Sequence, residues 1–224
     1  GGRMSEIAGK PCVVLTGGEH SFAQSVEATL GFPALRMGPD QLESFGSSLD
    51  GQLATEGVVW VHLVPGVTEP PSNGHDAPVF EEATLLERSA RTARDFADRT
   101  SIPLTFVAVL PALGLFAGEQ GRRCDLASAT MDSLMRTEIG RWSRSNDRIL
   151  AVAYAGLEGH VQEGQRPAHD IVERTPMKAL CSFEQLGDAL RFVGSRRAAY
   201  ITGTVLCVDG GWRPYSWMYP ARTI

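Results

Sequence analysis

Continuous apolar runs are the feature of this sequence that most restricts what the chain can fold into. They occupy residues 11–15, 58–64, 104–110, 149–154 and 204–208, with a weaker run at 34–37. Strands that are buried on both faces of a parallel sheet have this uninterrupted pattern, whereas half-exposed strands alternate. Apolar residues recur at helical spacing between the runs, at residues 131–142 and 183–193. This alternation predicts a doubly wound parallel α/β sheet with right-handed crossovers.

Length and composition are those of an ordinary globular domain. The chain has 224 residues, of which 43% are hydrophobic and 21% charged. These values predict one domain over residues 1–224 with a core of its own. The net charge of −5 argues against nucleic-acid or anionic-membrane partners. The longest apolar stretch is broken by Pro103 and Pro111, and it is too short to cross a bilayer.

The cysteines indicate a reducing environment. Cys12, Cys124, Cys181 and Cys207 lie far apart and form no Cys-x-x-Cys pair, so neither a disulfide scaffold nor a zinc site is expected. A cytoplasmic location fits this usage. Cys12 and Cys207 fall in strand-like runs and are expected in the core. Residues 1–3 precede Met4 and are expected to be a cloning remnant.

Residues 174–212 carry the most specific motifs of the chain. A helical pattern whose Ser182 and Gln185 have capping-box spacing is followed by AYITG at 199–203 and by VDGG at 208–211. This segment resembles the C-terminal quarter of a short-chain dehydrogenase/reductase. The resemblance implies a Rossmann-like sheet. It also places Thr16, Gly17 and Gly18 where the glycine-rich phosphate loop of that family begins.

The phosphate loop departs from the family pattern. A dinucleotide pyrophosphate is held by backbone N–H groups that glycines allow to approach closely. Gly17 matches the first family glycine, but the next two fall on Ser21 and Ala23. Phe22 adds bulk and Glu19 adds a negative charge. We therefore expect this chain to bind no cofactor.

The sequence also predicts a truncation between the second and third strands of the family. The interval from Thr16 to Gly66 is much shorter than in a full family member, so one strand and one helix are expected to be missing or vestigial. Those elements hold the adenosine half of the cofactor in the family. The family motif Asn-Asn-Ala-Gly is replaced by LVPG at 63–66, which removes further polar groups.

The catalytic set of the family is absent. Its serine, tyrosine and lysine positions fall on Pro111, Cys124 and Ser128. The loss of one positioned acid or base typically costs about 10²- to 10⁴-fold in rate, so no catalytic residue is expected. Cys124 as a nucleophile would need Arg122 and Arg123 to lower its pKa. A small residue that lines the pocket is the favoured interpretation of Cys124.

The histidines have two interpretations each. His62 lies within an apolar run and is expected to be a core histidine. His20 is expected at a helix start, where it could meet an anion or lie in solvent. His160 and His169 lie with Asp170 in a polar segment that would cover the substrate in active relatives. Their spacing matches no metal-ligand pattern, and a solvated loop is favoured over a catalytic role.

The C-terminal tail, residues 212–224, is unusually rich in aromatic groups. Such residues are enriched at protein interfaces, and a terminal extension cannot bury them all. We expect the tail to contact a partner protein rather than fold back on its own domain. The interface candidates are Trp212, Arg213, Tyr215, Trp217, Met218 and Tyr219.

Together these departures predict a non-catalytic subunit. The chain resembles the inactive second subunits of two-component ketoreductases from aminocoumarin antibiotic pathways. This implies an α2β2 complex with an active, NAD(P)-dependent short-chain dehydrogenase/reductase. The implied substrate is a β-hydroxy or β-keto group on a carrier protein or coenzyme A. Alternatives are a cofactor-independent enzyme (lyase, isomerase, dehalogenase or hydrolase) that recruits His20, Cys124, His160 or Asp170, and a small-molecule binding module.

Overall fold

Six parallel strands form the centre of the molecule. The computed structural model describes residues 12–18, 20–30, 34–38, 40–42, 57–64, 80–112, 118–144, 146–160 and 168–215. The strands are β1 (Cys12–Gly17), β2 (Ala34–Met37), β3 (Val58–Leu63), β4 (Leu104–Pro111), β5 (Arg148–Tyr154) and β6 (Val205–Val208). All six apolar runs of the sequence thus become strands, and the predicted parallel α/β sheet is confirmed.

The strand order β2-β1-β3-β4-β5-β6 contains one reversal. From β1 the chain moves to β2 on one side, and it then crosses to β3 on the other side. At such a switch point the loops that follow the two diverging strands leave a crevice at the carboxyl ends, where open α/β sheets bind their ligands. In the described sheet β2 is an edge strand, and residues 43–56 of the predicted truncation lie outside the described residues.

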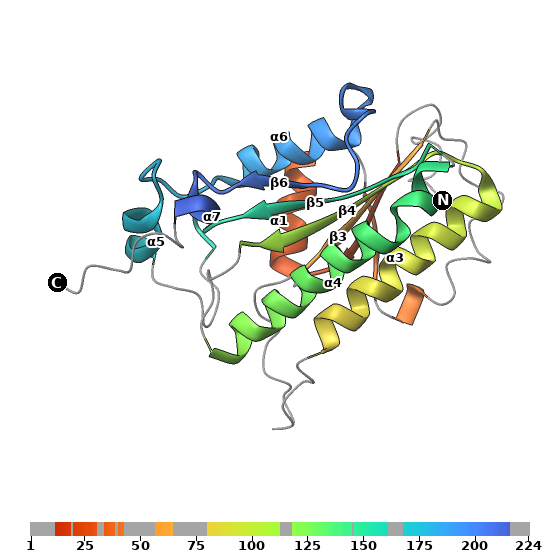
Figure 1. The fold of residues 1–224 in the computed structure, drawn as a ribbon. Helices are drawn as coiled ribbons and strands as arrows, with labels where there is room; N and C mark the ends of the chain where they lie inside the picture. Colours follow the sequence, from red (N-terminus) through yellow and green to blue (C-terminus); the bar gives the residue numbers. More distant parts are fainter. Residues whose placement is uncertain are drawn as a thin grey trace.

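Two helices cover each face of the sheet (Figure 1). One face carries α1 (His20–Leu30) and α6 (Phe183–Gly194), and the other carries α3 (Glu81–Thr100) and α4 (Gly118–Arg144). The predicted capping box of α6 is present, with Ser182 and Gln185 bonded to each other's backbone N–H groups. The described chain also contains α5 (Ala168–Arg174), the 3-10 turn η1 (Arg196–Ala198) and α7 (Trp212–Tyr215), and a single helical turn at residues 40–42.

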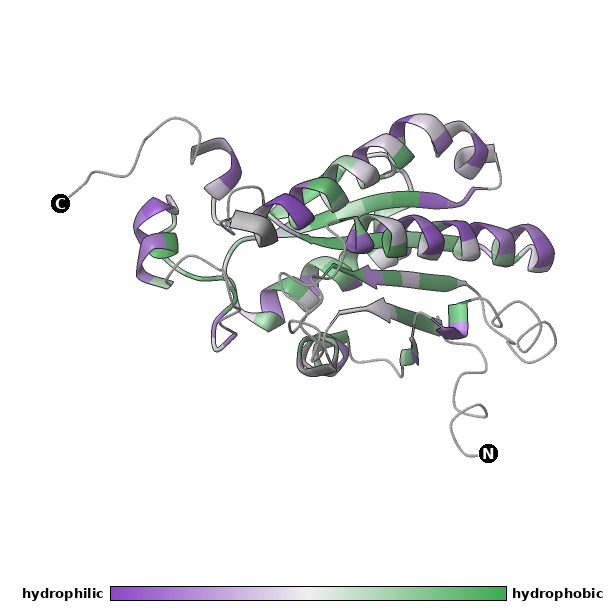
Figure 2. Cartoon of the chain, turned by 90° about the horizontal axis from the view of Figure 1, so that it is seen from below, coloured by the Kyte–Doolittle hydropathy of each residue, from purple (hydrophilic) through white to green (hydrophobic). Residues whose placement is uncertain are grey.

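The apolar surface is buried in two cores, one on each side of the sheet. Strands β4 and β5 are buried along their whole length, as their uninterrupted apolar sequences require. Figure 2 shows hydrophobic residues concentrated in the strands, while hydrophilic residues recur along the helices. No helix in the described part of the chain combines the length and apolar character needed to span a bilayer.

Two core assignments need correction. Cys207, expected in the core, is exposed, because β6 is an edge strand of the described sheet. Trp212, expected at an interface, is 1% exposed and packs in the core on the α1/α6 face. Asp209 causes this, since its carboxylate accepts the N–H groups of Gly211 and Arg213 at 2.9 Å and turns the chain back onto the sheet.

The structure describes the other interface candidates only in part. Arg213 is exposed. The side chain of Tyr215 and all of Trp217, Met218 and Tyr219 lie outside the described part of the structure, as do residues 1–3. The interface role of the tail beyond Trp212 stays a prediction.

Candidate functional site

The switch point between the carboxyl ends of β1 and β3 is where open α/β sheets bind their ligands. Gly17 and Gly18 follow each other there with φ values of +69° and +76°, a left-handed conformation that favours glycine. A Cβ atom on Gly17 would collide with the carbonyl oxygen of Leu63. Gly17 is therefore required by the close approach of β3, whether or not a phosphate binds.

An aromatic cluster, formed by Phe22, Tyr154, His160 and Phe183, fills the space beside this loop. The Phe22 side chain is fully buried, and its ring centroid lies 5.3 Å from that of His160, 5.8 Å from Tyr154 and 6.0 Å from Phe183. A Cβ atom on Gly18 would already meet Leu63 Cδ1 at 3.1 Å and Phe22 Cδ1 at 3.5 Å. The Gly18 backbone thus packs directly on the side chains of Leu63 and Phe22.

The other loop positions do not restore a phosphate cradle. Ser21 is exposed at the start of α1, and Ala23 is 5% exposed against the core. A glycine at the third loop position normally permits close helix–strand packing, and the small Ala23 side chain serves this packing here. At two of the three family glycine positions this loop thus carries a side chain.

Beneath the loop, on the opposite face of the sheet, lies a buried polar network. Thr16 Oγ1 is 2.9 Å from both His62 Nδ1 and Ser89 Oγ, and Trp60 Nε1 donates to Ser89 Oγ at 2.9 Å. Burial lowers the pKa of His62 to about 3, so the ring is neutral at physiological pH. His62 is thus a core histidine, as predicted, and it ties β3 to β1 rather than exchanging protons.

Two of the three positions that match the family's catalytic residues lie together. Pro111 ends β4, and Ser128 lies in α4. Both line a hollow of about 280 Å³, which Asp132 and Arg213 also line. A proline ring offers no proton, and no described side chain of the hollow is a histidine or lysine that could activate Ser128.

Cys124 lies one helical turn before Ser128 and packs in the core at 4% exposure, outside the residues that line the hollow. Burial raises the pKa of its thiol to about 12, and Glu82 and Asp125 add to this rise. Arg123 acts in the lowering direction, but the effect of burial is larger. The arginine neighbours therefore do not bring the Cys124 pKa below its ordinary value, as a nucleophile would need. Cys124 is a core residue, and the prediction that it lines the pocket is wrong.

Glu82 is a titratable group near this site that the sequence analysis did not single out. It lies in the first turn of α3, is 5% exposed, and interacts electrostatically with Arg123 of α4, which is 7% exposed. Burial, together with Glu81, raises its pKa to about 7. The sequence shows two adjacent glutamates at a helix start, but only the packing of α3 against α4 decides which one is buried.

Glu82 makes stability depend on pH. Between its ordinary pKa of 4.5 and its native value of about 7, the native state holds a proton that the unfolded state has lost. Stability therefore falls as pH rises through this range, by about 3 kcal/mol in total. Glu82→Gln is expected to remove the fall and to be more stable than wild type at pH 8, but not at pH 4. Urea unfolding across pH 4–8 measures this, with Glu87→Gln on the exposed side of α3 as control. A parallel decline in the Glu82→Gln variant would contradict it.

The predicted histidine group does not assemble. His160 belongs to the aromatic cluster, and burial lowers its pKa. His169 pairs with Asp170 at 2.9 Å on the exposed surface of α5. The His20 side chain lies outside the described atoms. Within the described ranges, no three His, Cys, Asp or Glu side chains are placed to hold a metal ion.

Known structures with the same architecture cover almost the whole chain. Aldohexose dehydrogenase of Thermoplasma acidophilum superposes with a TM-score of 0.69 at 15% identity, over 98% of this chain and 99% of that one. A short chain dehydrogenase of Bacillus anthracis gives 0.67 at 17% identity, over 97% and 100%. In sequence, the chain is 30% identical over 101 residues to an uncharacterized oxidoreductase of Bacillus subtilis. The chain has the short-chain dehydrogenase/reductase fold and shares sequence with members of that superfamily.

Sequence similarity to this superfamily is partial. A second match is an uncharacterized short-chain type dehydrogenase/reductase of Sinorhizobium fredii, 30% identical over 115 residues. The matched segments are 47% and 42% of this chain, and they span only 20% and 42% of the Sinorhizobium and Bacillus proteins. No protein-family profile matches the chain. A structural neighbour at 16% identity, with a TM-score of 0.61 over 93% of this chain and 98% of its own, is an NADH-dependent reductase of alginate metabolism.

Proposed function

We propose that this chain is a non-catalytic subunit of an oxidoreductase complex, in which an active short-chain dehydrogenase/reductase binds NAD(P) and performs the redox step. The aromatic cluster carries this proposal. Phe22 is fully buried beside the loop that would have to contact the pyrophosphate, and it is packed on His160. The positions that match the family's catalytic residues carry Pro111, Cys124 and Ser128, so the tyrosine and lysine that transfer the proton in the family are replaced. This replacement also supports a non-catalytic role.

The structure of the retained scaffold supports assembly as the remaining role. The described chain keeps six parallel strands with helices on both faces of the sheet, although the positions that match the family's reacting side chains carry other residues. A partner complex of α2β2 composition, and a β-hydroxy or β-keto substrate on a carrier protein or coenzyme A in antibiotic biosynthesis, are part of the proposal. The resemblance to inactive ketoreductase subunits supports them.

A cofactor-independent enzyme is less well supported. Each group that it would recruit has other contacts in the structure. Cys124 is a core thiol with a raised pKa, His160 stacks on Phe22, and Asp170 pairs with His169 at the surface. None of these side chains lines the hollow that contains Pro111 and Ser128.

Titration with reduced cofactor tests the cofactor half of the proposal. NADH and NADPH fluorescence is expected to show no saturable binding to the isolated chain up to about 1 mM, the upper end of common enzyme affinities. A complete short-chain dehydrogenase/reductase provides the positive control. Binding of either cofactor at micromolar concentration would overturn the proposal.

Co-expression tests the assembly half separately. The chain and a complete short-chain dehydrogenase/reductase from the same genome are expected to purify as one complex of fixed stoichiometry, with ketone turnover only when the partner is present. If the chain purifies as a homo-oligomer beside every such candidate, the subunit role is wrong even where no cofactor binds.

A further inference from the structure

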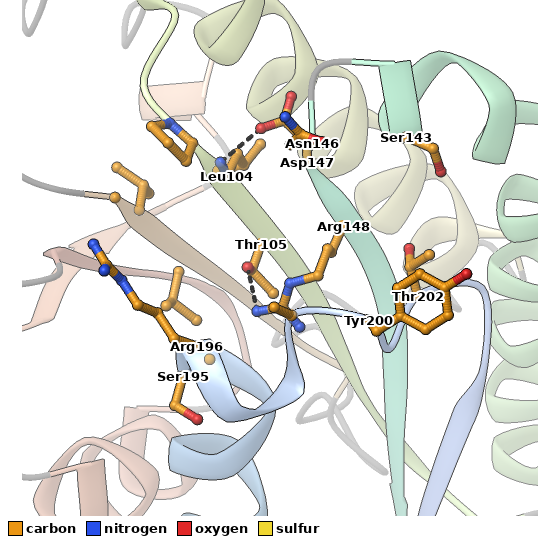
Figure 3. A pocket seen from close by; sticks show the side chains of 16 residues that line it. Leu104, Thr105, Ser143, Asn146, Asp147, Arg148, Ser195, Arg196, Tyr200 and Thr202 are labelled. Atoms are coloured by element: carbon orange, nitrogen blue, oxygen red, sulfur yellow. Dashed lines mark hydrogen bonds between the residues drawn. The ribbon is translucent and has the colours of Figure 1, made fainter.

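A pocket of about 970 Å³ lies at the opposite end of the sheet, where β3, β4 and β5 begin. Ligands of open α/β sheets bind at the carboxyl ends of the strands, so this amino-end pocket is separate from the site described above. Figure 3 shows it from close by. The lining residues that matter here are Thr105, Arg148, Ser195, Arg196, Tyr200 and Thr202.

Arg148, the first residue of β5, places a buried positive charge in the wall of this pocket. It is 8% exposed, and its guanidinium donates to Thr105 Oγ1 at 2.8 Å and to the carbonyl oxygen of Ala198 at 3.0 Å. A third acceptor is the carbonyl oxygen of Ile201 at 3.4 Å. All three acceptors are neutral, and no ion pair among the described residues includes Arg148. A buried charge is ordinarily paired with an opposite charge. Among the described residues, no negatively charged side chain pairs with the Arg148 guanidinium.

The neighbouring carboxylate does not supply that neutralisation. Asp147 also lines the pocket, but Arg94 Nη1 lies 2.7 Å from its Oδ2, and the Leu104 N–H donates to its Oδ1 at 2.8 Å. The charge of Asp147 is therefore balanced by Arg94. An anion from outside the chain would balance Arg148.

Two exposed side chains complete the pocket on either side of Arg148. In Figure 3, Arg196 stands on one wall and the Tyr200 ring on the other, next to Thr202. Arg196 adds a second guanidinium, a group whose planar fork matches carboxylate and phosphate oxygens. Tyr200 is fully exposed and presents a flat apolar ring of the kind on which planar ligands stack.

We propose that the amino-end pocket binds a small organic anion in which a phosphate or carboxylate is attached to a planar group. The anionic group lies against the guanidinium groups of Arg148 and Arg196. The planar group lies against Tyr200. The pocket and the hollow near Ser128 are at opposite ends of the sheet, so this binding does not depend on the proposed subunit role.

Titration of the full chain with phenyl phosphate and with benzoate tests the proposal, and neither probe is a fragment of NAD(P). The shifts of backbone amide signals are expected to saturate and to map to residues 195–203 and 146–148. The stronger of the two probes identifies the anionic group. Benzyl alcohol, which lacks the charge, is expected not to bind. Absence of saturable shifts with both anions would refute the proposal.

Surface variants locate the binding without disturbing the fold. Arg196→Ala and Tyr200→Ala are each expected to weaken the binding by about tenfold, as the loss of a charge-assisted hydrogen bond or a stacking contact does. Arg197→Ala is the matched control, because Arg197 is an exposed arginine in the same turn that does not line the pocket. Equal weakening by Arg197→Ala, or none by Arg196→Ala and Tyr200→Ala, would show general attraction of anions instead of this site.

Discussion

Trp212→Ala is expected to lower the free energy of unfolding by about 3 to 5 kcal/mol, the usual cost of truncating a buried aromatic side chain. The indole is 1% exposed and lies in the core on the α1/α6 face. Chemical denaturation measures the loss. Arg213→Ala, at the exposed neighbouring position, serves as control and is expected to change stability by no more than about 0.5 kcal/mol. A loss below about 1 kcal/mol for Trp212→Ala would show that the tail beyond Val208 contributes little to the fold.

This burial decides how the interface prediction has to be tested. Deletion of residues 212–224 would remove a core side chain, so any loss of partner binding could follow from unfolding alone. Deletion of residues 216–224 keeps Trp212 and the Asp209 turn. If Trp217, Met218 and Tyr219 contact the partner, this shorter deletion reduces complex formation while the thermal midpoint of the isolated chain stays unchanged.

Asp147→Ala is expected to destabilise the fold by about 3 to 5 kcal/mol, because it removes the buried carboxylate partner of Arg94 and leaves only the more exposed Asp98 to balance its charge. The two side chains are each 3% exposed and 2.7 Å apart. The carboxylate also accepts the Leu104 N–H at the start of β4, and the Arg94 guanidinium lies 5.1 Å from the centroid of the Trp142 ring. The variant therefore disrupts the junction of α3, α4 and β4, and urea unfolding measures the effect.

Asp98 provides the matched control for Asp147. It also pairs with Arg94, at 2.8 Å, but its side chain is 42% exposed. Exposed ion pairs contribute about 0 to 1 kcal/mol, so Asp98→Ala is expected to be far less destabilising than Asp147→Ala. Equal losses for the two variants would mean that burial of the Asp147 pair is not what gives it its effect.

The strands and their layering follow from the sequence because local composition is sufficient to specify them. Residues 104–110 and 149–154 are apolar without interruption, which only a strand covered on both faces accommodates. The Ser182–Gln185 spacing likewise predicts the start of α6, since both partners of a capping box lie within one helical turn. The residues Ser21 and Ala23, at positions where the resemblance places glycines, can also be identified from the sequence alone.

Other features depend on which residues meet across the fold, and no local pattern contains that information. The sequence alone determined the parallel α/β sheet, whereas the loss of the phosphate loop and of the serine, tyrosine and lysine set stays a prediction from the resemblance. The tertiary structure decided that Trp212 is a core residue, that Phe22 stacks on His160, that Glu82 is buried beside Arg123, and that Arg148 lies in a pocket wall with no ion pair among the described residues. Burial and electrostatic pairing depend on which residues are neighbours in space. Phe22 and His160 come together only when α1 and the segment after β5 pack at the carboxyl ends of the strands.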